Sequence, residues 1–174
     1  MLFNSWIFLF AYLPVTLAGF FILGRRSELC AAAWLAAASL FFYAYWDYRY
    51  LPLLLGSVVF NYGCAAWLAA SVPARRKWIL AAAIAANLGL LAYYKYAGFF
   101  VSSLAQLLDQ PLPVLHVVLP VGISFFTFTQ IAFLVDTCKG MARESRFVHY
   151  LLFVTYFPHL IAGPVLPHTE IMPQ

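Results

Sequence analysis

The residues best suited to chemistry are the histidines near the end of the chain, above all His159 in the stretch YFPHLIAGP. An imidazole there could act as a general base, ligate a metal or brace carbonyls freed from a helix. His149, His159 and His168 are too far apart to form a ligand pair on one helix face, and no cysteine or carboxylate stands beside His159. We expect no metal site, while a structural role, a place along a substrate path and direct chemistry stay open for His159.

The segment around His159 is predicted to be a broken helix. Pro158 disrupts the helix that begins near Phe147, and Gly163 with Pro164 ends any helical turn after the break. Residues 147–163 therefore fall short of the about 20 uninterrupted residues that cross a bilayer. Broken backbone at membrane depth is tolerated where it is buried in protein or lines a wet cavity. We predict a re-entrant or kinked element, with Pro158, His159 and Gly163 lining an interior.

The composition indicates a membrane environment. Of the 174 residues 65% are hydrophobic and 9% are charged, and the mean hydropathy is +0.87, whereas a soluble domain carries about a quarter charged residues. Uncharged runs long enough to cross a bilayer as helices recur along the chain. We predict one all-α, polytopic membrane domain over residues 1–174, with Pro120 in the first turn of the fifth span. About five spans are expected, near residues 3–23, 29–46, 51–70, 78–95 and 120–138, with the broken sixth segment at 147–163.

The positive charges alternate along the predicted loops. Stretches 25–26, 75–77 and 139–146 carry all the Lys and Arg residues except Arg49 and Lys95. We expect a protein of the cell (inner) membrane, and the positive-inside rule predicts that its N-terminus is extracytoplasmic. This topology explains the net charge of +4, so we expect no nucleic-acid partner. The opening MLFNSWIFLF has no basic residue, so we expect the first segment to be retained rather than cleaved as a signal peptide.

Polar side chains within the predicted spans need partners, because lipid offers none. We expect most of them to bond between helices. Gln130 belongs to this set and is a candidate for the wall of the interior. Lys95 is a second candidate, although its aromatic surroundings YYKYAGFF also suit a lysine that snorkels to the headgroups. The polar set comprises Asn61, Asn87, Ser124, Thr127, Thr129 and Gln130.

Two long stretches resemble the N-terminal part of the membrane-bound O-acyltransferase family, in its bacterial branch of alginate O-acetylases and D-alanyl transfer proteins. They are LPVGISFFTFTQIAFLVDTCKG and YFPHLIAGPVLPHTEIMPQ, and YYKYAGFF supports them. The resemblance implies acyl transfer from a cytoplasmic donor to a hydroxyl of an extracytoplasmic polymer, which needs a base and oxyanion stabilisation. In the family the base is a histidine that would lie downstream of Gln174, and nothing in residues 1–174 matches its motif. His159 matches the FPHLIAGP element, which the resemblance implies is part of the chamber wall.

The resemblance also implies ligands and partners. We expect no bound cofactor, with acetyl-CoA or another activated acyl group as the donor. The expected acceptor is an extracytoplasmic polysaccharide such as alginate. Membrane lipid and soluble or periplasmic acetylation partners are expected beside it.

Members of the family are longer, and this chain stops at Gln174, after EIMPQ, in the middle of the pattern. We therefore expect a truncated or fragmentary sequence that is inactive by itself. Two other functions stay open, a non-catalytic membrane scaffold and a small multi-span transporter. A transporter would bind its substrate at a broken helix, and an inverted repeat, which we do not see, would favour it.

Overall fold

The computed structural model describes residues 5–108, 118–141 and 146–156, and every regular element within them is a helix. A π-helical turn, η1, leads into the first α-helix, and a 3-10 turn, η2, joins the second to the third. The elements are η1 (Phe8–Tyr12), α1 (Leu13–Gly24), α2 (Glu28–Asp47), η2 (Tyr48–Tyr50), α3 (Leu51–Ala70), α4 (Pro73–Leu108), α5 (Ile123–Cys138) and α6 (Phe147–Thr155).

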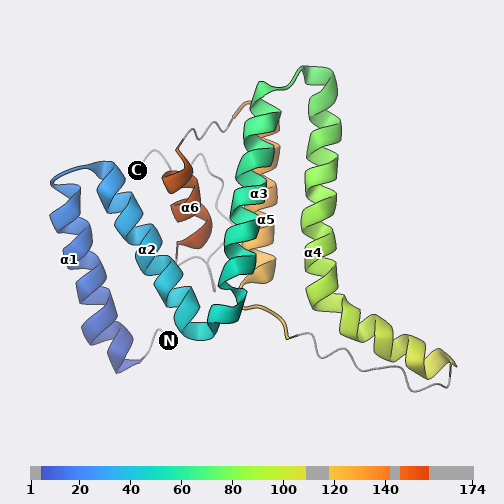
Figure 1. Ribbon diagram of the computed structural model, residues 1–174, viewed down its shortest axis with the longest axis horizontal. Coiled ribbons are helices and arrows are strands. Elements are labelled where there is room, and N and C mark those ends of the chain that lie inside the picture. Colours follow the sequence, from blue (N-terminus) through green and yellow to red (C-terminus); the bar gives the residue numbers. More distant parts are fainter. Residues whose placement is uncertain (1–4, 109–117, 142–145, 157–174) are drawn as a thin grey trace.

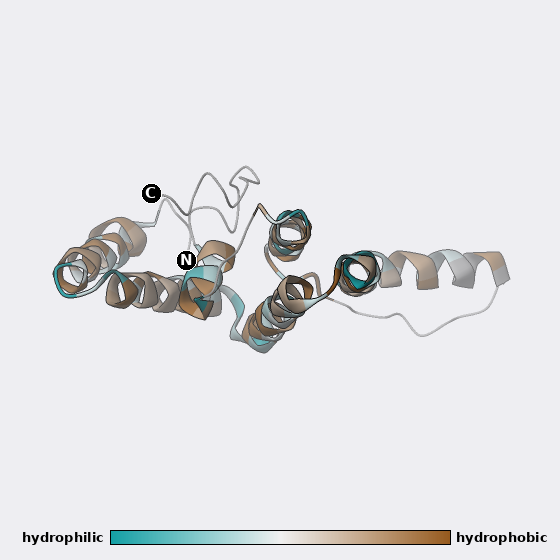
Figure 2. Cartoon of the chain, turned by 90° about the horizontal axis from the view of Figure 1, so that it is seen from above, coloured by the Kyte–Doolittle hydropathy of each residue, from teal (hydrophilic) through white to brown (hydrophobic). Residues whose placement is uncertain are grey.

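The helices stand side by side in a curved row (Figure 1, Figure 2). Helix α1 packs on α2, α2 packs on α6, and α5 packs against α3, α4 and α6. The last part of α4 projects away from the other helices in both views. Hydrophobic residues predominate along the helices in Figure 2. Helix α5 therefore lies in space among α3, α4 and α6.

Local signals explain how α2 and α3 begin and end. The Ser27 hydroxyl accepts a hydrogen bond from the Leu29 backbone N–H at 3.2 Å and so caps the first turn of α2. The Asp47 carboxylate accepts from the Arg49 N–H at 3.0 Å, which stabilises the turn η2. Pro52 lies in the first turn of α3, where a missing N–H costs nothing. Helices α2 and α3 consequently meet at a corner (Figure 1).

Helix α5 begins at Ile123, three residues after the start predicted at Pro120. Gly122 stands before it with φ 74°, a left-handed conformation that favours glycine. The Pro120 carbonyl accepts a hydrogen bond from Ile123 N–H, so the proline belongs to a turn that precedes the helix. The prediction that Pro120 lies in the first helical turn was therefore wrong, because the left-handed glycine interrupts the helix between them.

Two apolar helical stretches among the described residues are long enough to cross a membrane, Glu28–Ala70 and Pro73–Ser103, and the first contains the corner at η2. Phe8–Gly24 and Ile123–Cys138 are shorter apolar helices. The range predicted at 78–95 lies inside α4, which continues to Leu108. Crossing of the bilayer at each predicted span stays a prediction.

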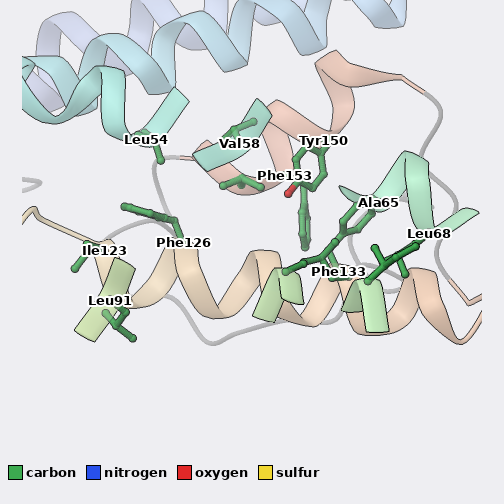
Figure 3. Packing of buried hydrophobic residues seen from close by; sticks show 14 of the residues in the cluster. Leu54, Val58, Ala65, Leu68, Leu91, Ile123, Phe126, Phe133, Tyr150 and Phe153 are labelled. Carbon is green, nitrogen blue, oxygen red and sulfur yellow. The ribbon is translucent and has the colours of Figure 1, made fainter. Parts of the chain in front are cut away.

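The main core joins α3, α4, α5 and α6. Tyr150 of α6 is fully buried, and its ring centroid lies 4.6 Å from that of Phe133 on α5. Figure 3 shows this ring beside Val58 and Phe153, with Leu54 and Phe126 further along the same interface. Many large apolar side chains on the outer faces are nonetheless exposed, including Trp6 and Trp78. A surface of that kind suits a lipid environment.

Helix α6 ends at Thr155, ahead of Pro158. A helix that stops before a proline fits the steric restriction on the residue that precedes it. Residues 157–163 of the predicted broken segment lie outside the described residues.

Candidate functional site

Five polar side chains are buried together where α3, α4, α5 and α6 meet, and we call them the polar cluster. Each of the four helices contributes at least one of them, and each side chain is less than a tenth exposed. The polar cluster consists of Ser57 and Asn61 on α3, Asn87 on α4, Gln130 on α5 and Tyr150 on α6.

One half of the polar cluster is a reciprocal pair of amides. Asn61 Nδ2 donates to Asn87 Oδ1 at 3.0 Å, and Asn87 Nδ2 donates to Asn61 Oδ1 at 2.7 Å. The second proton of each amide goes to a backbone carbonyl one turn back, Ser57 for Asn61 and Ala83 for Asn87. Every amide proton of the pair is thus satisfied, and α3 is fixed against α4.

The other half of the polar cluster is centred on Gln130. Its Nε2 donates to the Ser57 hydroxyl at 3.1 Å, and its Oε1 lies 3.5 Å from the Tyr150 hydroxyl, which donates to it in a long hydrogen bond. Gln130 therefore connects α3 with α6 through the centre of the fold. Because the Ser57 carbonyl also accepts from Asn61, the two halves are continuous.

The polar cluster contains only amides, an alcohol and a phenol. Such groups position a neighbour by hydrogen bonding, but none is a ready general base at neutral pH. Among the described residues no group of three His, Cys, Asp or Glu could hold a metal ion. Of the four histidines, only the half-buried His149 on α6 is described. The polar cluster is therefore suited to positioning neighbouring groups rather than to transferring protons.

A groove of about 350 Å³ between α3 and α4 opens onto the polar cluster. Ser57 and Asn87 form part of its wall, but their polar atoms are already bonded within the cluster. Gly56 leaves open space there, since a Cβ on it would meet nothing within 4 Å. The remaining lining residues are Pro52, Leu53, Phe60, Ala86 and Leu90.

The structure places two of the sequence-predicted site residues, and it places them differently. Gln130 is fully buried at the centre of the polar cluster. Lys95 is exposed on α4, with its Nζ 5.5 Å from the centroid of the Tyr96 ring, a cation–π contact. The two candidates for the chamber wall are therefore not brought together, because one lies inside the fold and the other on its surface.

The other predicted site residues, Pro158, His159 and Gly163, lie outside the described residues. Gln174 lies outside them as well, and the base histidine implied by the resemblance would come further downstream than Gln174. The chamber wall formed by the broken segment and the position of the base beyond residue 174 therefore stay predictions.

The prediction that buried polar groups bond between helices is confirmed for Asn61, Asn87 and Gln130. Thr127 and Thr129 are exceptions, because their buried hydroxyls have no hydrogen-bond partner. Sequence reasoning missed Ser57 and Tyr150. Ser57 stands four residues before Asn61 on the same helix face, a spacing that could have revealed it, whereas Tyr150 lies in an apolar run and carried no such signal.

Comparison with known proteins finds that the chain is similar to part of several bacterial O-acetyltransferases. The peptidoglycan O-acetyltransferase of Helicobacter pylori is 41% identical in a match that covers all of this chain and 38% of that protein. The probable alginate O-acetylase AlgI of Pseudomonas aeruginosa is 36% identical, covering all of this chain and 34% of that protein. AlgI of Pseudomonas putida is also 36% identical, over all of this chain and 37% of its own length.

The chain is a homologue of the N-terminal part of bacterial membrane-bound O-acyltransferases. The resemblance seen in its two long motifs is thereby confirmed, and the homology makes it a membrane protein. The chain spans little more than a third of the length of the relatives it matches. No family model and no solved structure matches it.

Proposed function

We propose that this chain forms the N-terminal part of a membrane-bound O-acyltransferase that transfers acetyl groups to hydroxyls of an extracytoplasmic polysaccharide. The observation that carries the proposal is the identity of 36–41% over the whole chain to a peptidoglycan O-acetyltransferase and to probable alginate O-acetylases. The donor would be acetyl-CoA or another activated acyl group. Soluble or periplasmic partners would assist the transfer.

In this proposal the described helices act as a wall that positions other groups. The polar cluster locks four helices through neutral hydrogen bonds, and a rigid wall is what electrostatic preorganisation of a reaction chamber requires. The proton of the acceptor hydroxyl would pass to a histidine downstream of Gln174. His159, Pro158 and Gly163 would line the chamber next to α6.

The proposal is tested in the bacterium that carries the gene. Deleting the gene should remove ester-linked acetate from one polymer, and the acetate released by mild alkali from extracellular polysaccharide and from peptidoglycan should be measured separately. Loss from the first polymer would indicate an alginate-type acceptor, and loss from the second would indicate the acceptor named for the Helicobacter pylori relative. Unchanged acetate in both would overturn the proposal.

The proposal that the catalytic base lies outside residues 1–174 can be tested separately. Purified residues 1–174, incubated with acetyl-CoA and an oligosaccharide acceptor, should transfer no acetyl group. Measured transfer would show that residues 1–174 contain the essential base, in contradiction of the proposal.

A further inference from the structure

A second groove, of about 470 Å³, lies between α2 on one side and η1 with α1 on the other. These helices stand at the opposite end of the row from α4 (Figure 1). The volume of the groove is that of a typical ligand pocket. Its walls are made almost entirely of hydrocarbon and aromatic rings. They are formed by Ile7, Ala11, Tyr12, Val15 and Thr16 on one side and by Trp34, Ala37, Ala38, Phe41 and Tyr45 on the other.

The main polar groups of these walls bond across the helix pair. The Tyr12 hydroxyl donates to the Ala38 carbonyl at 2.9 Å, and Trp34 Nε1 donates to the Thr16 carbonyl at 3.0 Å. Because both donors are already bonded, a molecule in the groove need not supply an acceptor for them. A polar ligand that entered this groove would lose its hydrogen bonds to water and gain none in return, whereas a hydrocarbon chain has no such hydrogen bonds to lose.

The indole ring of Trp34 lies across Gly19. A Cβ at Gly19 would collide with Trp34 Cε2 and Nε1, so only glycine lets the ring settle onto α1. From Trp34 the groove follows α2 as far as Tyr45, 11 residues or about 17 Å along the helix axis. The groove therefore runs along the helices, and we call it the slot.

The surroundings of the slot are those of a lipid contact. Ile7, Val15 and Phe41 in its walls are more than half exposed, so the slot continues the apolar outer face of a membrane protein. Arg49 is exposed in η2, directly after the end of α2 at which the slot reaches Tyr45. A cation at that level complements the phosphate of a lipid whose chain enters the slot.

We propose that the α1–α2 groove holds one acyl chain of a membrane phospholipid, with its tail toward Trp34 and its phosphate near Arg49. The proposal rests on membrane location alone and not on the proposed acyl transfer. It makes the α1–α2 pair a lipid-binding unit of the protein.

Tryptophan quenching by brominated lipid tests the proposal. The full chain is prepared with Trp34 as its single tryptophan, the others being replaced by phenylalanine, and is placed in bilayer nanodiscs of phosphatidylcholine brominated along its acyl chains. Trp34 should be quenched. Ala37→Phe and Ala11→Phe, both at exposed positions in the slot, should fill it and abolish most of that quenching. Ala82→Phe, at an exposed position on α4, should leave it unchanged.

A second single-tryptophan protein that keeps the exposed Trp67 provides the reference for ordinary lipid contact. Trp67 should be quenched equally with and without the slot-filling substitutions. If Trp67 is quenched while Trp34 is not, another helix or water occupies the slot and the proposal fails. It fails equally if Trp34 keeps its quenching in both slot-filling variants.

Discussion

Asn61 and Asn87 join α3 to α4 through reciprocal amide hydrogen bonds, so a substitution at either residue should weaken the packing of the two helices. An amide buried without a partner costs more than a missing hydrogen bond, because its remaining groups stay desolvated. We expect Asn61→Leu and Asn87→Leu each to lower the free energy of unfolding by about 1 kcal/mol, near the range measured between membrane helices. The double variant should lose less than the sum, since it leaves neither amide of the pair unpaired.

Unfolding of the purified protein in detergent, followed by circular dichroism during a denaturant titration, measures these differences. Ser102→Ala is the matched control, because the Ser102 hydroxyl bonds at the exposed end of α4. Strict additivity of the two leucine substitutions would contradict the coupling of the pair.

At the scale of elements, α5 is delimited by two left-handed glycines. Gly122 precedes it with φ 74°, and Gly140 comes after it with φ 76°. At the second end, the Met141 N–H donates to the Asp136 carbonyl at 2.9 Å and the Gly140 N–H donates to the Thr137 carbonyl at 3.0 Å, which is a Schellman motif. The central helix therefore has well-defined ends.

At Gly140 the free-energy cost of the left-handed backbone conformation can be measured separately from any side-chain collision. A Cβ there would meet nothing within 4 Å, so Gly140→Ala adds backbone strain without a collision. We expect a loss of about 1–2 kcal/mol in the free energy of unfolding. Gly140→Asn should lose less, because asparagine tolerates the left-handed region. Equal losses for alanine and asparagine in the same denaturant titration would argue against a left-handed Gly140.

Sequence patterns predicted helices better than they predicted helix partners. Charge-free runs located α1, α2, α3 and α5, because helix formation depends on local hydrophobicity and caps. The packing of α6 against α2, and of α5 among three helices, brings together residues far apart in the chain, and no local pattern encodes it. Gln130 was recognised as a buried polar group without its partners: Ser57 had a local signal in its spacing from Asn61, whereas Tyr150 had none.

On the scale of the whole molecule, the positive charges agree with the arrangement of the helices. Figure 1 places the α1–α2 turn, the α3–α4 turn and the end of α5 toward one side of the row, and the α2–α3 corner toward the other. Arg25, Arg76 and Lys139 belong to the first side, and Arg49 belongs to the second. The 20 residues of α3 that separate the two sides span about 30 Å, the thickness of the hydrocarbon core.

This geometry supports an orientation with the basic side in the cytoplasm. A reporter fused at Arg76 should therefore report the cytoplasm, and one fused at Asp47 the outside. The charge pattern of the sequence predicts the cytoplasm for a fusion at Arg143 as well. Alkaline phosphatase, active only outside, and green fluorescent protein, fluorescent only inside, give opposite readings at each site and control for expression. Phosphatase activity at Arg76 with fluorescence at Asp47 would reverse the orientation. It would then place the Arg49 end of the lipid slot at the cytoplasmic leaflet, where anionic lipids supply the stronger attraction for a cation.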